Sequence, residues 1–107
     1  MSDEALAGPV LDDSGEELRR VVAGIVTRTP GVVRLVRPRW RRGTGGDEAA
    51  VRVSSRDGAT GIEVEICVDL TVPIVVLTED LRTRIRAAVE ATGRAAGPVT
   101  VVVSRAL

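Results

Sequence analysis

Residues 60–70 alternate between apolar and polar side chains, and this pattern constrains the fold more than any other stretch of the chain. The apolar set is Ile62, Val64, Ile66, Val68 and Leu70, and the polar set is Glu63, Glu65, Cys67 and Asp69. A period of two residues is that of a β-strand, whose successive side chains point to opposite faces of a sheet. The pattern therefore predicts a sheet that other elements cover on one face only, with an acidic row on the opposite face.

A second strand is predicted just before this one, at residues 49–55, and Asp57-Gly58 lies between the two. An Asp-Gly pair is typical of a two-residue type I′ turn, which fixes the register of a hairpin. The turn predicts these opposed pairs: Val51 with Val64, Val53 with Ile62, and Arg52 with Glu63. Apolar side chains then meet apolar ones and opposite charges meet, so the register is self-consistent.

Helical spacing of apolar residues predicts one helix that starts at a Ser14–Glu17 capping box and another over about 73–93. The buried stripe expected of the second helix is Ile74, Leu77, Leu81, Ile85 and Val89. Short β-branched runs predict strands at 32–37 and 99–104. The order is α-β-β-β-α-β, so we expect an α+β fold of two layers: a four-stranded mixed sheet with two helices on one face.

The length of 107 residues predicts one small domain. Residues 1–13 contain four acids and Gly8-Pro9, and we interpret them as a disordered acidic lead-in to a domain at 14–107. Phe and Tyr are absent and Trp40 is the sole aromatic residue, so branched aliphatic side chains must fill the core.

The residue types needed for most enzyme chemistry are missing from the chain. It has no His to serve as a base, no Lys to form a Schiff base, and one Cys, which is too few for a zinc site or an internal disulfide. Cys67 lies between Glu65 and Asp69, whose carboxylates disfavour a thiolate, so we interpret it as an inert thiol. We expect a protein that is not an enzyme, with no catalytic residues, no cofactor and no metal.

No apolar run approaches the roughly 20 residues that span a bilayer, so we expect no direct membrane insertion. The acidic N-terminus differs from the basic start of a signal peptide. These features predict a cytoplasmic location.

Arginine is concentrated in residues 18–46, which carry eight arginines and no acid. The candidate partner surface within this segment is Arg34, Arg37, Arg39, Trp40, Arg41 and Arg42. Arginines beside a tryptophan suit a protein partner, anionic lipid or nucleic-acid phosphates, and they also suit a solvated strand end that resists aggregation. The formal net charge is zero, whereas a dedicated nucleic-acid binder is usually basic.

A second candidate surface is the sheet face opposite the helices. If Val33 and Leu35 face the helices, the residues that point outward are Val32, Arg34, Val36 and, from the last strand, Val102. The acidic row would lie on this same face. Such a mixture of valines, arginine and carboxylates predicts self-association into a homo-oligomer.

Three parts of the chain resemble one known family. They are residues 18–25 with the following TPGVVRL at 29–35, GIEVEICV at 61–68, and residues 81–89 with GPVTVVV at 97–103. Together they are similar to the opening helix and strand, the long alternating strand, and the closing helix and strand of the alkaline shock protein, or Gls-type, envelope stress response family of Gram-positive bacteria. The resemblance covers about residues 16–105.

The resemblance implies a non-enzymatic cytoplasmic protein, peripheral at the inner face of the cell membrane. It also implies self-association and binding to a membrane-anchored protein partner, in support of the cell envelope under stress. The alternative interpretation is a small nucleic-acid-binding domain that uses the Arg/Trp loop at 34–42. These two functions remain open on the sequence.

Overall fold

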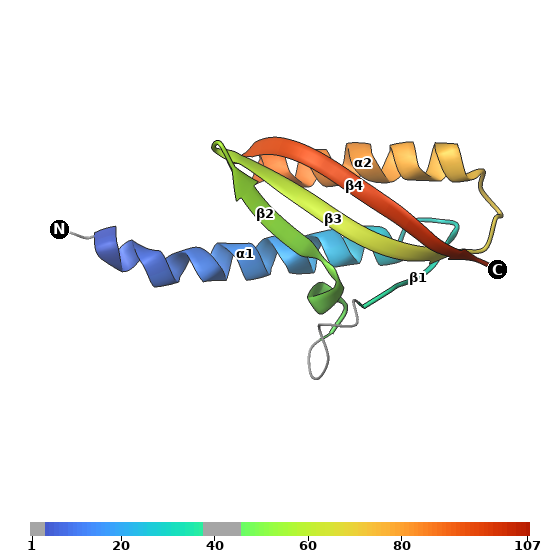
Figure 1. Cartoon of the computed structure of the whole chain (residues 1–107), viewed down its shortest axis with the longest axis horizontal. Coiled ribbons are helices and arrows are strands. Elements are labelled where there is room, and N and C mark those ends of the chain that lie inside the picture. The colour runs from blue at the N-terminus through green and yellow to red at the C-terminus, as the bar shows by residue number, and fades with distance from the viewer. Residues whose placement is uncertain (1–3, 38–45) are drawn as a thin grey trace.

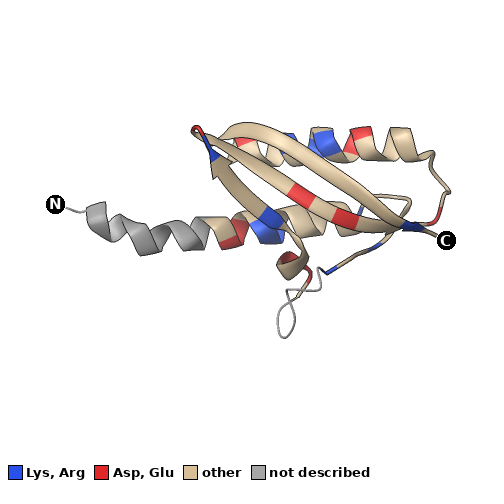
Figure 2. Ribbon diagram, viewed as in Figure 1, with Lys and Arg blue, Asp and Glu red and all other residues tan. Residues whose placement is uncertain are grey.

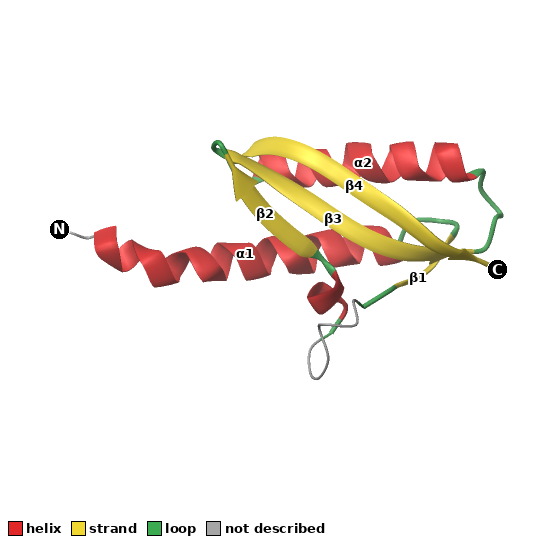
Figure 3. Ribbon diagram, viewed as in Figure 1, coloured by secondary structure: helices red, strands yellow, loops and turns green. Residues whose placement is uncertain are grey.

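The computed structural model describes the backbone of residues 4–37 and 46–107, and the side chains from residue 15 onward within those ranges. The described elements, in chain order, are α1 (Glu4–Thr27), β1 (Val32–Leu35), the short 3-10 helix η1 (Asp47–Ala50), β2 (Arg52–Arg56), β3 (Ala59–Val68), α2 (Ile74–Ala91) and β4 (Ala95–Ala106) (Figure 3). Apart from η1, this order confirms the predicted α-β-β-β-α-β arrangement.

The sheet is organised around β3, which pairs with every other strand (Figure 1). Along one edge, β2 pairs with residues 59–63 of β3 and β1 pairs with residues 66–68, both antiparallel. β4 runs parallel to β3 along the opposite edge. The four-stranded mixed sheet is therefore as predicted, and β1 and β2 follow one another along a single edge of β3.

Both helices lie on one face of the sheet, so the molecule has two layers (Figure 1). The alternation of β3 decides which side chains they cover, because its even-numbered apolar residues point toward the helices. The core combines those residues with apolar stripes of α1 and α2; its most buried members include Leu18, Val22, Val26, Ile62, Val64, Ile66, Val68, Leu77, Leu81, Ile85 and Val89. We call the uncovered side of the sheet the open face.

The β2–β3 hairpin has the predicted turn and register. Asp57 and Gly58 have φ angles of 53° and 80°, as both central residues of a type I′ turn require. Across the strands, Val53 lies opposite Ile62 and Arg52 lies opposite Glu63. An Asp-Gly turn and a period-two pattern are local signals, which is why they determined this part of the fold correctly.

The first helix begins earlier than the sequence analysis predicts. α1 starts at Glu4, within the segment expected to be a disordered lead-in, and it continues through Ser14. The capping box at Ser14 is therefore wrong as a helix start. Residues 5–7 are Ala-Leu-Ala, which have high helix propensities, and an acidic residue at position 4 suits the positive end of the helix dipole.

A β-bulge in β1 changes which of its residues face outward. Val32 lies opposite Val68 and Arg34 lies opposite Cys67, so Val33 is an extra residue without a partner in the ladder. Val32 packs against the core and Val33 is 44% exposed. The prediction that Val32 faces outward is therefore wrong. The extra residue Val33 shifts the inward–outward alternation of side chains, so Val32 and Arg34 do not share a face.

The junction between β3 and α2 differs from the predicted stripes at two positions. β3 ends at Val68, and Leu70 is exposed with a φ angle of 64°, so it does not continue the apolar face of the strand. Ile74 opens α2 and is 38% exposed, so the buried stripe of this helix begins at Leu77.

Candidate functional site

The open face carries a mixture of charges that the strand register brings together. Glu63 and Glu65 lie on β3, with Arg52 beside Glu63 on β2 (Figure 2). On the other side of β3, Thr100 lies opposite Glu63 and Val102 lies opposite Glu65. The predicted acidic row is therefore flanked by a basic side chain on one strand and by uncharged side chains on the other.

Only part of this charge is neutralised within one copy of the chain. Arg52 Nη1 lies 3.8 Å from Glu63 Oε1, and both side chains are about half exposed, so the pair is a weak, solvent-screened one. Within residues 15–37 and 46–107, the side chains of Arg34, Glu65 and Arg105 have no ion pair or hydrogen bond. These groups remain available to a binding partner.

Cys67 lies on the open face, yet it is only 2% exposed. Its lateral neighbours in the sheet are Arg34 on β1 and Arg105 on β4. The residues nearest to Cys67 across the sheet are therefore these two arginines. These two neighbours could not be identified from the sequence, where the charged residues closest to Cys67 are Glu65 and Asp69.

The three other residues of the predicted self-association face lie where they were expected. Arg34 is exposed on the open face, and Val102 points the same way with 40% of its side chain exposed. Val36 follows the buried Leu35, and its N–H donates a hydrogen bond of 2.8 Å to the carbonyl of Glu65. Val36 is half-buried at the margin of this face.

The Arg/Trp segment lies mostly beyond what the structure describes. Arg39, Trp40, Arg41 and Arg42 fall outside the described residues. Arg37 is exposed, and its Nη2 donates a hydrogen bond of 3.3 Å to the carbonyl of Gly46. Arg34 lies on the open face, opposite Cys67 of β3.

A further feature, which the sequence analysis missed, is the edge of β4 that faces away from β3. We call it the free edge, because among the described strands β4 pairs only with β3. Residues 99–104 of β4 read VTVVVS and carry no charge. Long apolar edge strands without charged residues are templates for pairing with another chain. The uncharged run is visible in the sequence, but the spatial order of the strands is needed to show that it lies on an edge of the sheet.

The backbone groups on the free edge can be assigned from the hydrogen bonds of β3. The carbonyl of Glu65 accepts the N–H of Val36, so it points toward β1. Successive residues of a strand point their N–H and C=O groups in opposite directions, so Ile66 points toward β4. In a parallel pair of strands, a residue whose N–H and C=O point toward the neighbouring strand lies opposite a residue whose N–H and C=O point away from it. Ile62, Val64 and Ile66 of β3 all point toward β4 in this way. The residues of β4 opposite them are Val99, Val101 and Val103, whose N–H and C=O groups therefore face the free edge.

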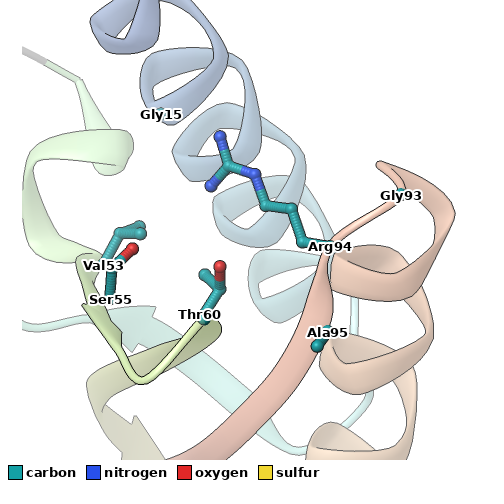
Figure 4. Close-up of a pocket in the computed structure, with 8 residues that line it drawn as sticks. Gly15, Val53, Ser55, Thr60, Gly93, Arg94 and Ala95 are labelled. Carbon is teal, nitrogen blue, oxygen red and sulfur yellow. The ribbon is translucent and has the colours of Figure 1, made fainter.

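An open pocket lies at the end of the sheet that carries the β2–β3 turn, between α1, this turn and the start of β4 (Figure 4). Its volume is about 450 Å³, and its lining residues are Gly15, Val53, Ser55, Gly58, Thr60, Gly93, Arg94 and Ala95. The lining offers hydroxyls and one guanidinium but no carboxylate, imidazole or thiol. Across the described residues, no group of three or more His, Cys, Asp and Glu side chains is placed to hold a metal ion.

No helix in the described part of the chain is long and apolar enough to cross a membrane. The chain matches no protein-family model and no curated protein.

Proposed function

We propose that this protein is a non-enzymatic interaction module that self-associates and binds a membrane-anchored protein partner. The observation that supports this proposal best is the sheet with helices on only one face. The open face holds the unpaired charges of Arg34, Glu65 and Arg105 together with the exposed Val102. Charges of both signs beside exposed valine form a surface that another protein surface can complement.

The cellular role in this proposal comes from the resemblance to the envelope stress response family. That resemblance extends over residues 16–105 and includes the alternating strand whose outward carboxylates contribute to the open face. It supports a role for the protein in the cytoplasm, peripheral to the inner face of the cell membrane, where it would help to maintain the envelope under stress.

Two measurements test this proposal. Light scattering coupled to gel filtration, over a range of concentrations, is expected to give a mass above the 11.3 kDa of one chain. The purified protein is also expected to sediment with membranes from the source cells, and to lose this binding after protease treatment of those membranes. A mass of 11.3 kDa at every concentration would count against self-association.

Membrane sedimentation and a nucleic-acid binding assay distinguish a protein anchor from lipid and from nucleic acid. Sedimentation with membranes that survives protease treatment would indicate lipid rather than a protein anchor. Retention on nucleic acid at physiological salt would favour the alternative function of the Arg/Trp loop.

The contribution of that loop is tested by reversing the charges of Arg39, Arg41 and Arg42 to Glu. If the loop recruits the partner, the variant should stay folded and lose membrane sedimentation, and Trp40→Ala should weaken it more than any single Arg change. Full recruitment of the triple variant would assign the loop no role in binding.

A further inference from the structure

We propose that two copies of the chain join antiparallel through their free edges, with a two-fold axis at Val102, to form one continuous sheet. This inference rests on the self-association in the proposed function and specifies the surface that carries it. The surface is the edge of β4 rather than the open face, so the copies lie side by side instead of stacking.

The centre of the contact follows from which backbone groups remain unpaired. Of the three edge-facing residues, Val99 already has its carbonyl occupied, because Arg82 Nε donates to it at 3.3 Å. The N–H and C=O groups of Val101 and Val103 have no such hydrogen-bond partner among the described residues. An axis at Val102 places Val101 of one copy opposite Val103 of the other, so all of these groups gain partners. An axis one residue earlier would instead require the occupied carbonyl of Val99.

The side chains at this centre also fit a second copy. Val102 would face its own counterpart in a non-hydrogen-bonded pair, where Cα atoms approach to about 4.5 Å. Its side chain is 40% exposed on the open face, and pairing would bury this apolar surface. Because residues 99–104 carry no charge, no like charges meet between the two paired strands.

The helix beside the free edge supplies charge complementarity. Glu79 and Arg86 lie three residues before and four residues after Arg82, so they share its flank of α2. Both side chains are exposed and have no ion pair or hydrogen bond with the described residues. In Figure 1, the N-terminal half of α2 extends beyond the free edge of β4.

A two-fold axis would bring the two copies of α2 together in antiparallel orientation. Glu79 of one copy would then approach Arg86 of the other, and the symmetry repeats this pair. The second copy is therefore the occupant that the surface specifies, because it brings both an unpaired apolar strand and the matching charges. A foreign strand would need to reproduce each of these features.

The test is site-specific disulfide trapping with Val102→Cys and its matched control Thr100→Cys. Both substitutions are on exposed open-face positions of β4, and both variants retain the buried Cys67. Position 102 faces itself across the axis at a separation that a disulfide can bridge. Position 100 is offset from its counterpart by four residues, or roughly 14 Å, which exceeds the reach of a disulfide.

We expect Val102→Cys to form a covalent dimer on mild oxidation and Thr100→Cys to remain a single chain on a non-reducing gel. Equal cross-linking of the two variants would overturn the register. If the wild type is an oligomer and Val102→Cys does not cross-link, the edge contact is wrong while self-association stands. A wild type that is monomeric at all concentrations overturns both.

The helix contact has its own test by charge exchange. Glu79→Arg and Arg86→Glu should each weaken the dimer by roughly ten-fold or more, because each places like charges together across the axis. The double variant Glu79→Arg with Arg86→Glu should restore the wild-type dissociation constant. If both single variants dimerise as the wild type does, or if the double variant fails to recover, the antiparallel helix contact is overturned.

Discussion

Arg82 joins the middle of α2 to the free edge of β4, since its Nε–H donates a hydrogen bond to the carbonyl oxygen of Val99, 3.3 Å away. Helix and strand are thereby held together at the point where the sheet ends. The bond also occupies an edge acceptor that a neighbouring strand would otherwise use. Val101 and Val103 are the edge-facing residues of β4 whose backbone groups it leaves open.

Replacing Arg82 with Met should lower the free energy of unfolding by about 1 kcal/mol, because a charged donor to a backbone carbonyl is lost while the aliphatic stem is kept. Urea denaturation measures the change. Arg84→Met is the matched control, since Arg84 pairs only with Asp80 on the exposed helix surface and should cost less. Equal losses in the two variants would show that the bond to Val99 contributes nothing specific.

Gly58→Val should lower the free energy of unfolding by about 1–2 kcal/mol, because the φ angle of 80° is strained for a β-branched residue. A Cβ atom at this position meets no atom within 4 Å, so the loss would come from backbone conformation alone. Gly58→Asn should cost much less, because Asn tolerates this region. The type I′ assignment fails if thermal melts find Val as stable as Asn.

The Cys67 thiol should be protected from a thiol reagent in the folded protein, because it is only 2% exposed. Labelling with a chromogenic disulfide is expected to be slow in buffer and complete in denaturant. Thr100→Cys supplies the comparison, since its new thiol occupies an exposed position on the open face and should react promptly. Prompt labelling of Cys67 in the wild type would contradict its burial in the folded protein.

The pKa of Asp69 is lowered by hydrogen bonds from the Thr71 side chain and from the Thr71 backbone N–H, at 2.7 and 2.9 Å. Its folded pKa is below its unfolded value of about 3.9, so the charged form stabilises the fold above that pH. This stabilisation is lost as the pH falls through the folded pKa. Asp69→Asn should therefore melt below the wild type at pH 7 and approach it in acid. A difference that is constant from pH 7 to strong acid would contradict the role of the charge.

The features that could be predicted from the sequence were those set by local signals. The Asp57-Gly58 turn and the alternation after it determined the hairpin register, because turn geometry and side-chain period leave few other pairings. The same alternation correctly placed Glu63 and Glu65 on the uncovered face of the sheet. Arg34, Val36 and Val102 were also placed correctly.

Three of the features that the sequence did not predict depend on effects that act between strands. The extra residue Val33 makes the side chain of Val32 point toward the core, and nothing in the sequence indicates a bulge there. Cys67 was assigned to its correct face, but its partners across the sheet, Arg34 and Arg105, come from distant parts of the chain, and its burial was not predicted. The free edge of β4 required the spatial order of strands, which the succession of elements does not specify.

Sedimentation equilibrium of the wild type and of Val102→Lys tests self-association most directly. The wild type should have about twice the mass of the 11.3 kDa chain, or a larger multiple, at micromolar concentrations. Val102→Lys should remain at 11.3 kDa with a nearly unchanged melting temperature, because the new charge lies on an exposed position and meets its own copy across the axis. A wild-type chain that stays at 11.3 kDa throughout the concentration range would contradict the account.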